Sequence, residues 1–347
     1  MKIKKVRFMI NNISFNGIFN IQNNNKISFR AKSLPNDTFE KSSSPLKDNE
    51  FIKWAKENNF LSCGIKASLV DENLLGKGFS HSVYKIPNND DYVLRVSRNY
   101  FDPKEVDFSQ YKIKDTEDKS LKSNFGQEVA KIEADDFRMP SISVLRKQTG
   151  TSNGNPPPSA IHYENGKLRE GELEYEAIER KEHYANSLQF LADAPQEAYD
   201  SLMDKFSELD EAGYKFDYYN PNNFLLDKNK GTIEIIDLDK MPKPYENDLG
   251  NALWALTNIE YLNTYLTDSY NEKDPKISDE DKNRAIKNTL NVIDKYTKAM
   301  QKKGKKFSQN GYEFTVHLLG SFPMSIFLQT NSQSEKIEKL RNMGLID

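Results

Sequence analysis

Cysteine is almost absent from this chain of 347 residues, which contains a single thiol, Cys63. One cysteine excludes an internal disulfide and a multi-cysteine zinc site, and it indicates a reducing compartment. The four histidines lack the HExxH spacing of a zinc enzyme. No stretch reaches the ~18 consecutive apolar residues that a membrane-spanning helix needs. The 49 Lys and Arg against 52 Asp and Glu give a net charge of -3, so we expect no general attraction to nucleic acid.

Residues 1–47 have too little apolar content to form a core. They contain the polar run QNNN and the segment KSSSP, and we expect them to form a flexible leader. Asn and Ser residues interrupt the apolar stretch near the start, so a continuous signal-peptide core is missing. We therefore expect a cytoplasmic protein and leave open secretion by a route that needs no signal peptide.

The rest of the chain divides into a β-rich part and a mainly helical part. Residues 48–59 have apolar side chains at helical spacing, and three short apolar runs then predict strands at 74–75, 83–86 and 92–96. We expect a loop over 103–124, a short helix over 125–134, a strand over 141–147 and a turn-rich break at 150–158. From 173 onward the pattern predicts helices at 196–212, 246–268, 278–303 and 334–343, an uncertain apolar piece at 312–328, and strands at 216–227 and 232–239.

The segment LGKGFSHSVY contains two glycines, Gly76 and Gly78, between two predicted strands. Glycines at this spacing let a hairpin turn tightly enough for backbone N–H groups to approach phosphates. Val83 on the returning strand could then cover a flat base. A dinucleotide-binding loop would lead into a helix, whereas a strand follows here, so that reading fails. A plain hairpin turn remains the alternative.

Two cations near this hairpin are candidates for binding phosphate. Arg95 lies on the third strand, and Lys85 has the same side-chain parity as Val83. Glu128, on the helix expected over 125–134, could pair with Arg95 and orient it, and Glu133 competes for that role. Each of these charges could equally be an exposed surface residue.

The strongest pattern combines a loop Asp, a loop Asn and a second Asp around two apolar strands. Asp217 precedes the sequence YYNPNNFLLD, and Asp237 ends the run IEIID. Carboxylate and amide oxygens at strand ends suit Mg²⁺, so Asp237 with Asn222 or Asn223 could hold the metal. Asp217 could orient or deprotonate an acceptor hydroxyl. An Asx-rich turn between two strands is the alternative.

This order of motifs resembles the protein-kinase-like superfamily, which includes aminoglycoside phosphotransferase-type enzymes and bacterial effector kinases. The resemblance covers roughly residues 70–250. It implies an α+β, two-lobed fold with a β-rich N-lobe over 48–172 and a helical C-lobe over 173–347. It also implies ATP and Mg²⁺ in the cleft. By position it implies phosphate-cradling Gly76 and Gly78, adenine-covering Val83, Arg95 at the strand lysine, Glu128 as its helix partner, catalytic Asp217, metal-binding Asn222 or Asn223, and metal-binding Asp237.

Several residues depart from the family pattern. Phe216 stands where a histidine precedes the catalytic aspartate, and the loop is one residue longer if Asn223 is the metal ligand. The resemblance implies transfer of the γ-phosphoryl group of ATP to a hydroxyl on a protein or small molecule. The departures keep a second hypothesis open, a pseudokinase that binds a nucleotide or a partner without turnover. Nucleotidyl transfer is a third.

Overall fold

A computed structural model describes residues 49–77, 81–97, 106–136, 139–154, 163–164, 167–168, 172–241, 246–267, 276–309 and 318–347. The chain divides into two units, Met1–Leu46 and Lys47–Asp347, and every described residue belongs to the second. The leader predicted over 1–47 lies outside the described residues.

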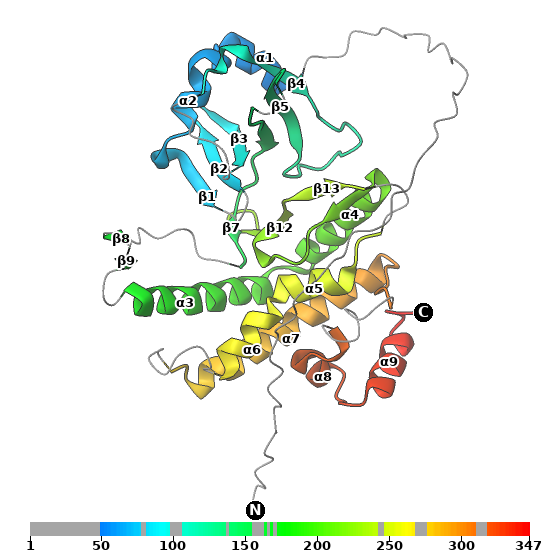
Figure 1. Cartoon of the computed structure of the whole chain (residues 1–347). Coiled ribbons are helices and arrows are strands. Elements are labelled where there is room, and N and C mark those ends of the chain that lie inside the picture. Colours follow the sequence, from blue (N-terminus) through cyan, green and yellow to red (C-terminus); the bar gives the residue numbers. More distant parts are fainter. Residues whose placement is uncertain are drawn as a thin grey trace, which may run out of the picture. The chain divides into compact units, whose positions relative to one another are not determined.

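The N-terminal region opens with helix α1, Glu50–Glu57 (Figure 1). Asn49 caps it, because its Oδ1 accepts hydrogen bonds from the N–H groups of Phe51 and Ile52. The Nδ2 of Asn49 donates to the carbonyl of Val129 at 2.8 Å, and the Phe51 ring lies 5.2 Å from that of Tyr92. These contacts hold α1 against a sheet. Three short helical segments follow it: the π-helical turn η1 (Phe60–Gly64), α2 (Ile65–Ser68) and the 3-10 turn η2 (Asp71–Asn73).

The sheet has six antiparallel strands in the order β1-β2-β3-β6-β5-β4. Their bounds are β1 Leu74–Lys77, β2 His81–Ile86, β3 Asn89–Ser97, β4 Tyr111–Asp115, β5 Glu128–Ala134 and β6 Ile142–Arg146. The strands predicted near 74, 83–86, 92–96 and 141–147 are confirmed. Leu94, Ile132 and Val144 are fully buried in the core between this sheet and the preceding helices.

Two predictions for this region are wrong. The helix expected over 125–134 is strand β5, because Val129 and Ile132 are buried between paired neighbours in the sheet. The loop expected over 103–124 contains the turn η3 (Phe108–Gln110) and strand β4. Tyr111 and Ile113 alternate with two exposed lysines in β4, which is the period-2 pattern of a half-buried strand.

The C-terminal region is mainly helical. Its helices are α3 Glu172–Asp193, α4 Gln196–Ala212, α5 Leu249–Thr257, α6 Ile259–Thr267, α7 Asp279–Lys302, α8 Phe322–Phe327 and α9 Gln333–Asn342. The single helix expected over 246–268 is broken at Asn258, which adopts a left-handed conformation with φ of 50°. Gly213 ends α4 in the same way with φ of 74°, as its position after the apolar pattern predicts.

Short strands between α4 and α5 form a β island, residues 214–240. It contains β10 (Tyr214–Phe216) paired with β13 (Leu238–Lys240), the turn η4 (Pro221–Asn223), and β11 (Phe224–Asp227) paired with β12 (Thr232–Ile235). β11 also pairs with β7 (Thr151–Ser152), in the segment expected to be a turn-rich break. A separate two-stranded pair, β8 (Tyr163–Glu164) and β9 (Lys167–Leu168), follows β7 in the chain.

The described side chains form two hydrophobic cores, one in each region. Leu121 and Phe125, from the segment between β4 and β5, are buried in the C-terminal core. This segment therefore ties the N-terminal sheet to the helical region. The expected α+β fold class is confirmed: an antiparallel sheet region precedes a helical region, and each region has a hydrophobic core. Among the helices of the described residues, none has the length and apolarity to cross a membrane.

Candidate functional site

The β island brings Asp217 and Asp237 to the same place. Phe216, the last residue of β10, pairs with Leu238, the first residue of β13. In an antiparallel pair, the residue that follows Phe216 therefore lies beside the residue that precedes Leu238. Those residues are Asp217 and Asp237. Phe216 is fully buried and anchors this pairing in the core. Two acidic residues twenty positions apart in the sequence are thus backbone neighbours at one edge of the island.

The two candidate asparagines have different surroundings. Asn223 is 4% exposed, and its Nδ2 donates to the main-chain oxygen of Asp217 at 2.8 Å and to Oδ2 of Asp217 at 3.3 Å. Its own carbonyl accepts a hydrogen bond from the N–H of Ile236 at 3.0 Å. Asn223 therefore links the Asp217 loop to the residue before Asp237. In contrast, Oδ1 of Asn222 accepts a hydrogen bond from the hydroxyl of Ser152 in β7.

Asp237 lies in an unusual backbone conformation and pairs with Arg95. Its φ is 61°, in the left-handed region that a non-glycine residue enters only at a cost. Its Oδ1 accepts a hydrogen bond from Nη1 of Arg95 at 2.9 Å. This contact joins the third strand of the N-terminal sheet to the β island across 142 positions of sequence. The side chains are 29% and 49% exposed, so the pair itself stabilises the fold by only about 0–1 kcal/mol.

The glycine hairpin consists of β1 and β2, and β2 pairs with β3, the strand that carries Arg95. Gly76 pairs with Val83, and Val83 pairs with Arg95, so Val83 and Arg95 share a face of the sheet. A Cβ atom added at Gly76 would meet nothing within 4 Å, which leaves open space beside this strand. Gly78 lies outside the described residues. Lys85 is exposed on β2, opposite Val93.

Glu128 does not have the role that the sequence suggested. It begins strand β5 instead of lying on a helix, and within the described residues the ion-pair partner of Arg95 is Asp237. Glu128 lies near enough to Tyr214 for its charge to affect the pKa of the Tyr214 hydroxyl. Burial raises the pKa of Tyr214, as do its hydrogen bond to Asp118 and the negative charges of Asp118 and Glu128. The competing residue Glu133 pairs with Lys131 and Lys114.

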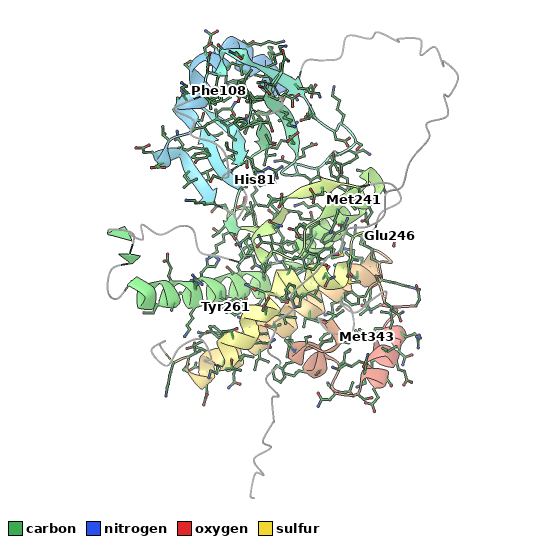
Figure 2. All side chains as sticks on the ribbon, viewed as in Figure 1. His81, Phe108, Met241, Glu246, Tyr261 and Met343 are labelled. Atoms are coloured by element: carbon green, nitrogen blue, oxygen red, sulfur yellow. The ribbon has the colours of Figure 1, made fainter. Side chains whose placement is uncertain are left out.

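His81 is a site residue whose surroundings the sequence did not reveal. It is the first residue of β2, labelled in Figure 2. Burial lowers the pKa of its imidazole, the positive charge of Arg95 lowers it further, and the negative charge of Asp237 raises it. His81 is therefore close enough to Arg95 and Asp237 for both charges to affect its pKa. The only sequence signal was its place in the glycine-rich segment.

A second group of residues, from the β7 segment and α3, supports the η4 turn through contacts with Asn222 and Ser152. Gly154 approaches Asn222 so closely that an added Cβ would lie 2.8 Å from its Oδ1. Nε2 of His183 on α3 donates to the carbonyl of Ser152 at 2.7 Å. Burial lowers the pKa of His183. Because Ser152 in turn bonds Asn222, these residues position the loop that carries Asn223. Their separation in sequence hides the arrangement.

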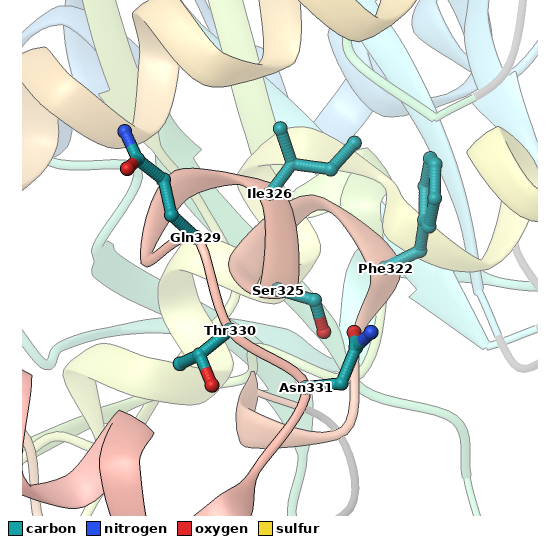
Figure 3. Close-up of a pocket in the computed structure, with 6 residues that line it drawn as sticks. All are labelled: Phe322, Ser325, Ile326, Gln329, Thr330 and Asn331. Atoms are coloured by element: carbon teal, nitrogen blue, oxygen red, sulfur yellow. The ribbon is translucent and has the colours of Figure 1, made fainter.

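A concave surface elsewhere in the C-terminal region has a different character. It is a pocket of about 290 Å³ beside α8, shown in Figure 3, and no ionisable side chain lines it. Its lining residues are Phe322, Ser325, Ile326, Gln329, Thr330 and Asn331. No cationic side chain lines this pocket to neutralise a phosphate, so the candidate site remains the region around Asp237.

The donor atoms around Asp237 do not fit Mg²⁺ well as they are arranged. One oxygen of Asp237 faces the guanidinium of Arg95, and the side-chain oxygen of Asn222 faces Ser152. Asn223 turns its NH₂ group to Asp217. The described residues also contain no group of three or more His, Cys, Asp or Glu side chains that could hold a metal ion. A positive charge already lies at the carboxylate that would hold the metal.

Comparison with known proteins gives little further guidance. No protein-family model matches the chain, and no curated protein is a significant match. One solved structure with some likeness is the pseudokinase domain of BIR2, an immune regulator of the RLK/Pelle family. It is 12% identical, with 73% of this chain and 87% of that chain covered, at a TM-score of 0.26. A score of this size carries no argument about function.

Proposed function

We propose that this chain binds ATP between the glycine hairpin and the β island, and transfers its γ-phosphoryl group to a hydroxyl on a protein or small molecule. The observation that supports this most is the Arg95–Asp237 contact. It brings a cation of the hairpin sheet to the acidic edge that also carries Asp217 and Asn223. Phosphoryl transfer needs such a set, because its catalysis rests on positioning and on neutralising charge.

Asp217 has the better-defined part in the transfer step. Its carboxylate accepts hydrogen bonds from the N–H of Tyr219 at 3.2 Å and from the amide of Asn223 at 3.3 Å, which fix its orientation. In the proposed step the acceptor oxygen forms a bond to the γ-phosphorus while the bond to ADP breaks. Asp217 accepts the proton that leaves the hydroxyl. Asn223, not Asn222, would support it, because Asn222 is turned toward β7.

The second candidate function is nucleotide binding without turnover. The specific observation in its favour is the same ion pair, because Arg95 neutralises the carboxylate that the resemblance assigns to the metal. In this case ATP would act as a structural ligand that stabilises the fold. Binding and transfer can be measured separately, so the two candidates are distinguishable.

ATP binding is tested by thermal unfolding with and without nucleotide. A ligand of the native state at a hundredfold excess over its Kd stabilises by about 2.7 kcal/mol. The matched variant is Gly76→Ala. Its Cβ enters open space, so we expect unchanged stability without nucleotide and a smaller shift with ATP. Absence of any shift in the wild type would refute the proposal.

Transfer is tested with labelled ATP and candidate acceptors. We expect Asp217→Asn to keep the ATP-induced stabilisation and to lose transfer. Asp204→Asn, which changes an exposed carboxylate on α4, is the control that should keep both. Binding without transfer in the wild type, for every acceptor tried, would favour the second candidate.

A further inference from the structure

We infer that the guanidinium of Arg95 bridges Asp237 and the nucleotide phosphates, so that nucleotide binding at this site does not require Mg²⁺. The inference rests on the proposed ATP binding and concerns what holds the phosphates. In kinase-type sites, metal ions bridge the phosphate oxygens and neutralise their charge. Here Arg95 already contacts the carboxylate from which such a metal would be held.

The geometry of arginine suits a bridge of this kind. A guanidinium has five N–H donors in a rigid fork and matches carboxylate and phosphate groups. In Arg95, Nη1 is used by Asp237, while the side chain remains 29% exposed and so accessible to a ligand. Its Nε is buried and has no hydrogen-bond partner among the described residues. A buried donor without a partner is uncommon, and it indicates that an acceptor belongs near this guanidinium.

Arg95 also lies beside the strands where the phosphates are proposed to bind. Val83 opposite it shares its face of the sheet, and Gly76 opposite Val83 leaves open space. A phosphate bound over this strand pair would lie on the same face of the sheet as Arg95. A metal ion at Asp237 would have to displace Nη1 or use only the second carboxylate oxygen. The cation already present makes this displacement unnecessary for binding.

The test is calorimetric titration of the full chain with ATP, in excess Mg²⁺ and in excess EDTA. We expect the two Kd values to agree within about threefold. Binding in Mg²⁺ that weakens about tenfold or more in EDTA would overturn this inference and leave the proposed ATP binding intact. No binding in either condition would overturn both.

Variants of the two partners sharpen the result. Arg95→Gln removes the charge, and we expect binding in EDTA to weaken by about tenfold or more. Arg146→Gln is the matched control, an ion-paired arginine on β6 of the same sheet, which should bind as the wild type does. Melting temperatures without nucleotide show whether each variant is folded. Equal binding by Arg95→Gln and Arg146→Gln in EDTA would overturn the inference.

Asp237→Asn separates the bridging arginine from a bridging metal. If a metal held by Asp237 carries the phosphates, this variant should bind ATP more weakly. If Arg95 carries them, loss of the negative charge removes a repulsion, and binding in EDTA should tighten by roughly threefold. A folded Asp237→Asn variant that binds ATP more weakly than the wild type in excess Mg²⁺, but equally well in EDTA, would overturn the inference.

Discussion

Asp118 is predicted to fasten the segment between β4 and β5 to the β island, and Asp118→Asn tests this. Its Oδ2 accepts hydrogen bonds from Tyr214 at 2.9 Å and from Lys240 at 2.5 Å. Its Oδ1 accepts from the N–H and hydroxyl of Ser120. Lys240 ends β13, three residues after Asp237. The network therefore restrains the strand that follows the candidate site.

The expected loss can be worked out from these contacts. Asparagine keeps one acceptor oxygen for Ser120 but places an NH₂ group where Tyr214 and Lys240 now donate. Two hydrogen bonds to a charged group are thereby weakened, each ordinarily contributing about 1.5–3 kcal/mol. The side chains of Asp118 and Lys240 are 24% and 50% exposed, so solvent screens part of this. We expect the free energy of unfolding to fall by roughly 1.5–3 kcal/mol.

The effect should depend on pH with a defined sign. Burial alone would raise the pKa of Asp118, but hydrogen bonds from Lys240, Ser120 and Tyr214 outweigh it and hold that pKa well below its ordinary value of 3.8. A carboxyl group with a lowered pKa stabilises the fold above its unfolded pKa. The stabilisation is lost as pH falls through the folded one. The difference between wild type and Asp118→Asn should therefore be full at neutral pH and shrink below about pH 4.

Urea unfolding at neutral and acidic pH measures this difference. The matched control is Asp135→Asn, which changes a partner of Lys112 in a pair whose side chains are 70% and 83% exposed. An exposed pair of this kind contributes little, so no measurable change is expected. If Asp118→Asn lost no more stability than Asp135→Asn, or if its deficit were the same in acid, the reasoning would be refuted.

Two further predictions concern the residues behind the η4 turn. Gly154→Ala should lower the free energy of unfolding by about 1–3 kcal/mol and weaken ATP binding, because the new Cβ would displace Asn222; an unchanged urea midpoint would contradict the close approach. Burial lowers the pKa of His183 below the unfolded value of 6.5, so protonation favours unfolding and stability should fall as pH drops below about 6.5. Unfolding curves of His183→Gln should show a weaker pH dependence, and an equal slope in both proteins would contradict it.

The parts of the fold that sequence predicts well are those fixed by neighbouring residues. Helix α4 follows from its apolar spacing and from Gly213, which can take a positive φ at no steric cost. The β11–β12 hairpin follows from two apolar runs around an Asx-rich turn, and Asp227 stabilises that turn by accepting from the N–H groups of Asn229 and Lys230. The candidate acidic residues at the strand ends are predictable for the same reason.

Strand β5 was misread because its pattern also fits a helix. Val129 and Ile132 are three residues apart, which places them on one helical face, yet both are fully buried in a strand beside Ala130. The deciding information lay in its neighbour, since Tyr111 and Ile113 alternate with lysines and supply a strand for β5 to pair with. Pairing between strands overrides local periodicity when both faces of a strand can be covered.

The partner of Arg95 could not be predicted, because it depends on distances set by strand order. Arg95 pairs with Ser143 on β6, while Glu128 pairs with Leu145 from the far side of that strand. Two strand spacings across the sheet and two residues along it separate the backbones of Arg95 and Glu128 by about 12 Å. To form an ion pair, the side chains of Arg95 and Glu128 would have to reach toward each other across β6, the strand that lies between them.

The carboxylate that pairs with Arg95 comes from outside the sheet, from Asp237. Asp237 lies within reach of Arg95 because the register of β10 with β13 and the hydrogen bond from Ile236 to Asn223 fix where the chain leaves β12. The positive φ of Asp237 turns the chain between β12 and β13. At this turn, Oδ1 of Asp237 lies 2.9 Å from Nη1 of Arg95. The local sequence determines the hairpin, but only the folded connection between the two regions determines which charge the hairpin meets.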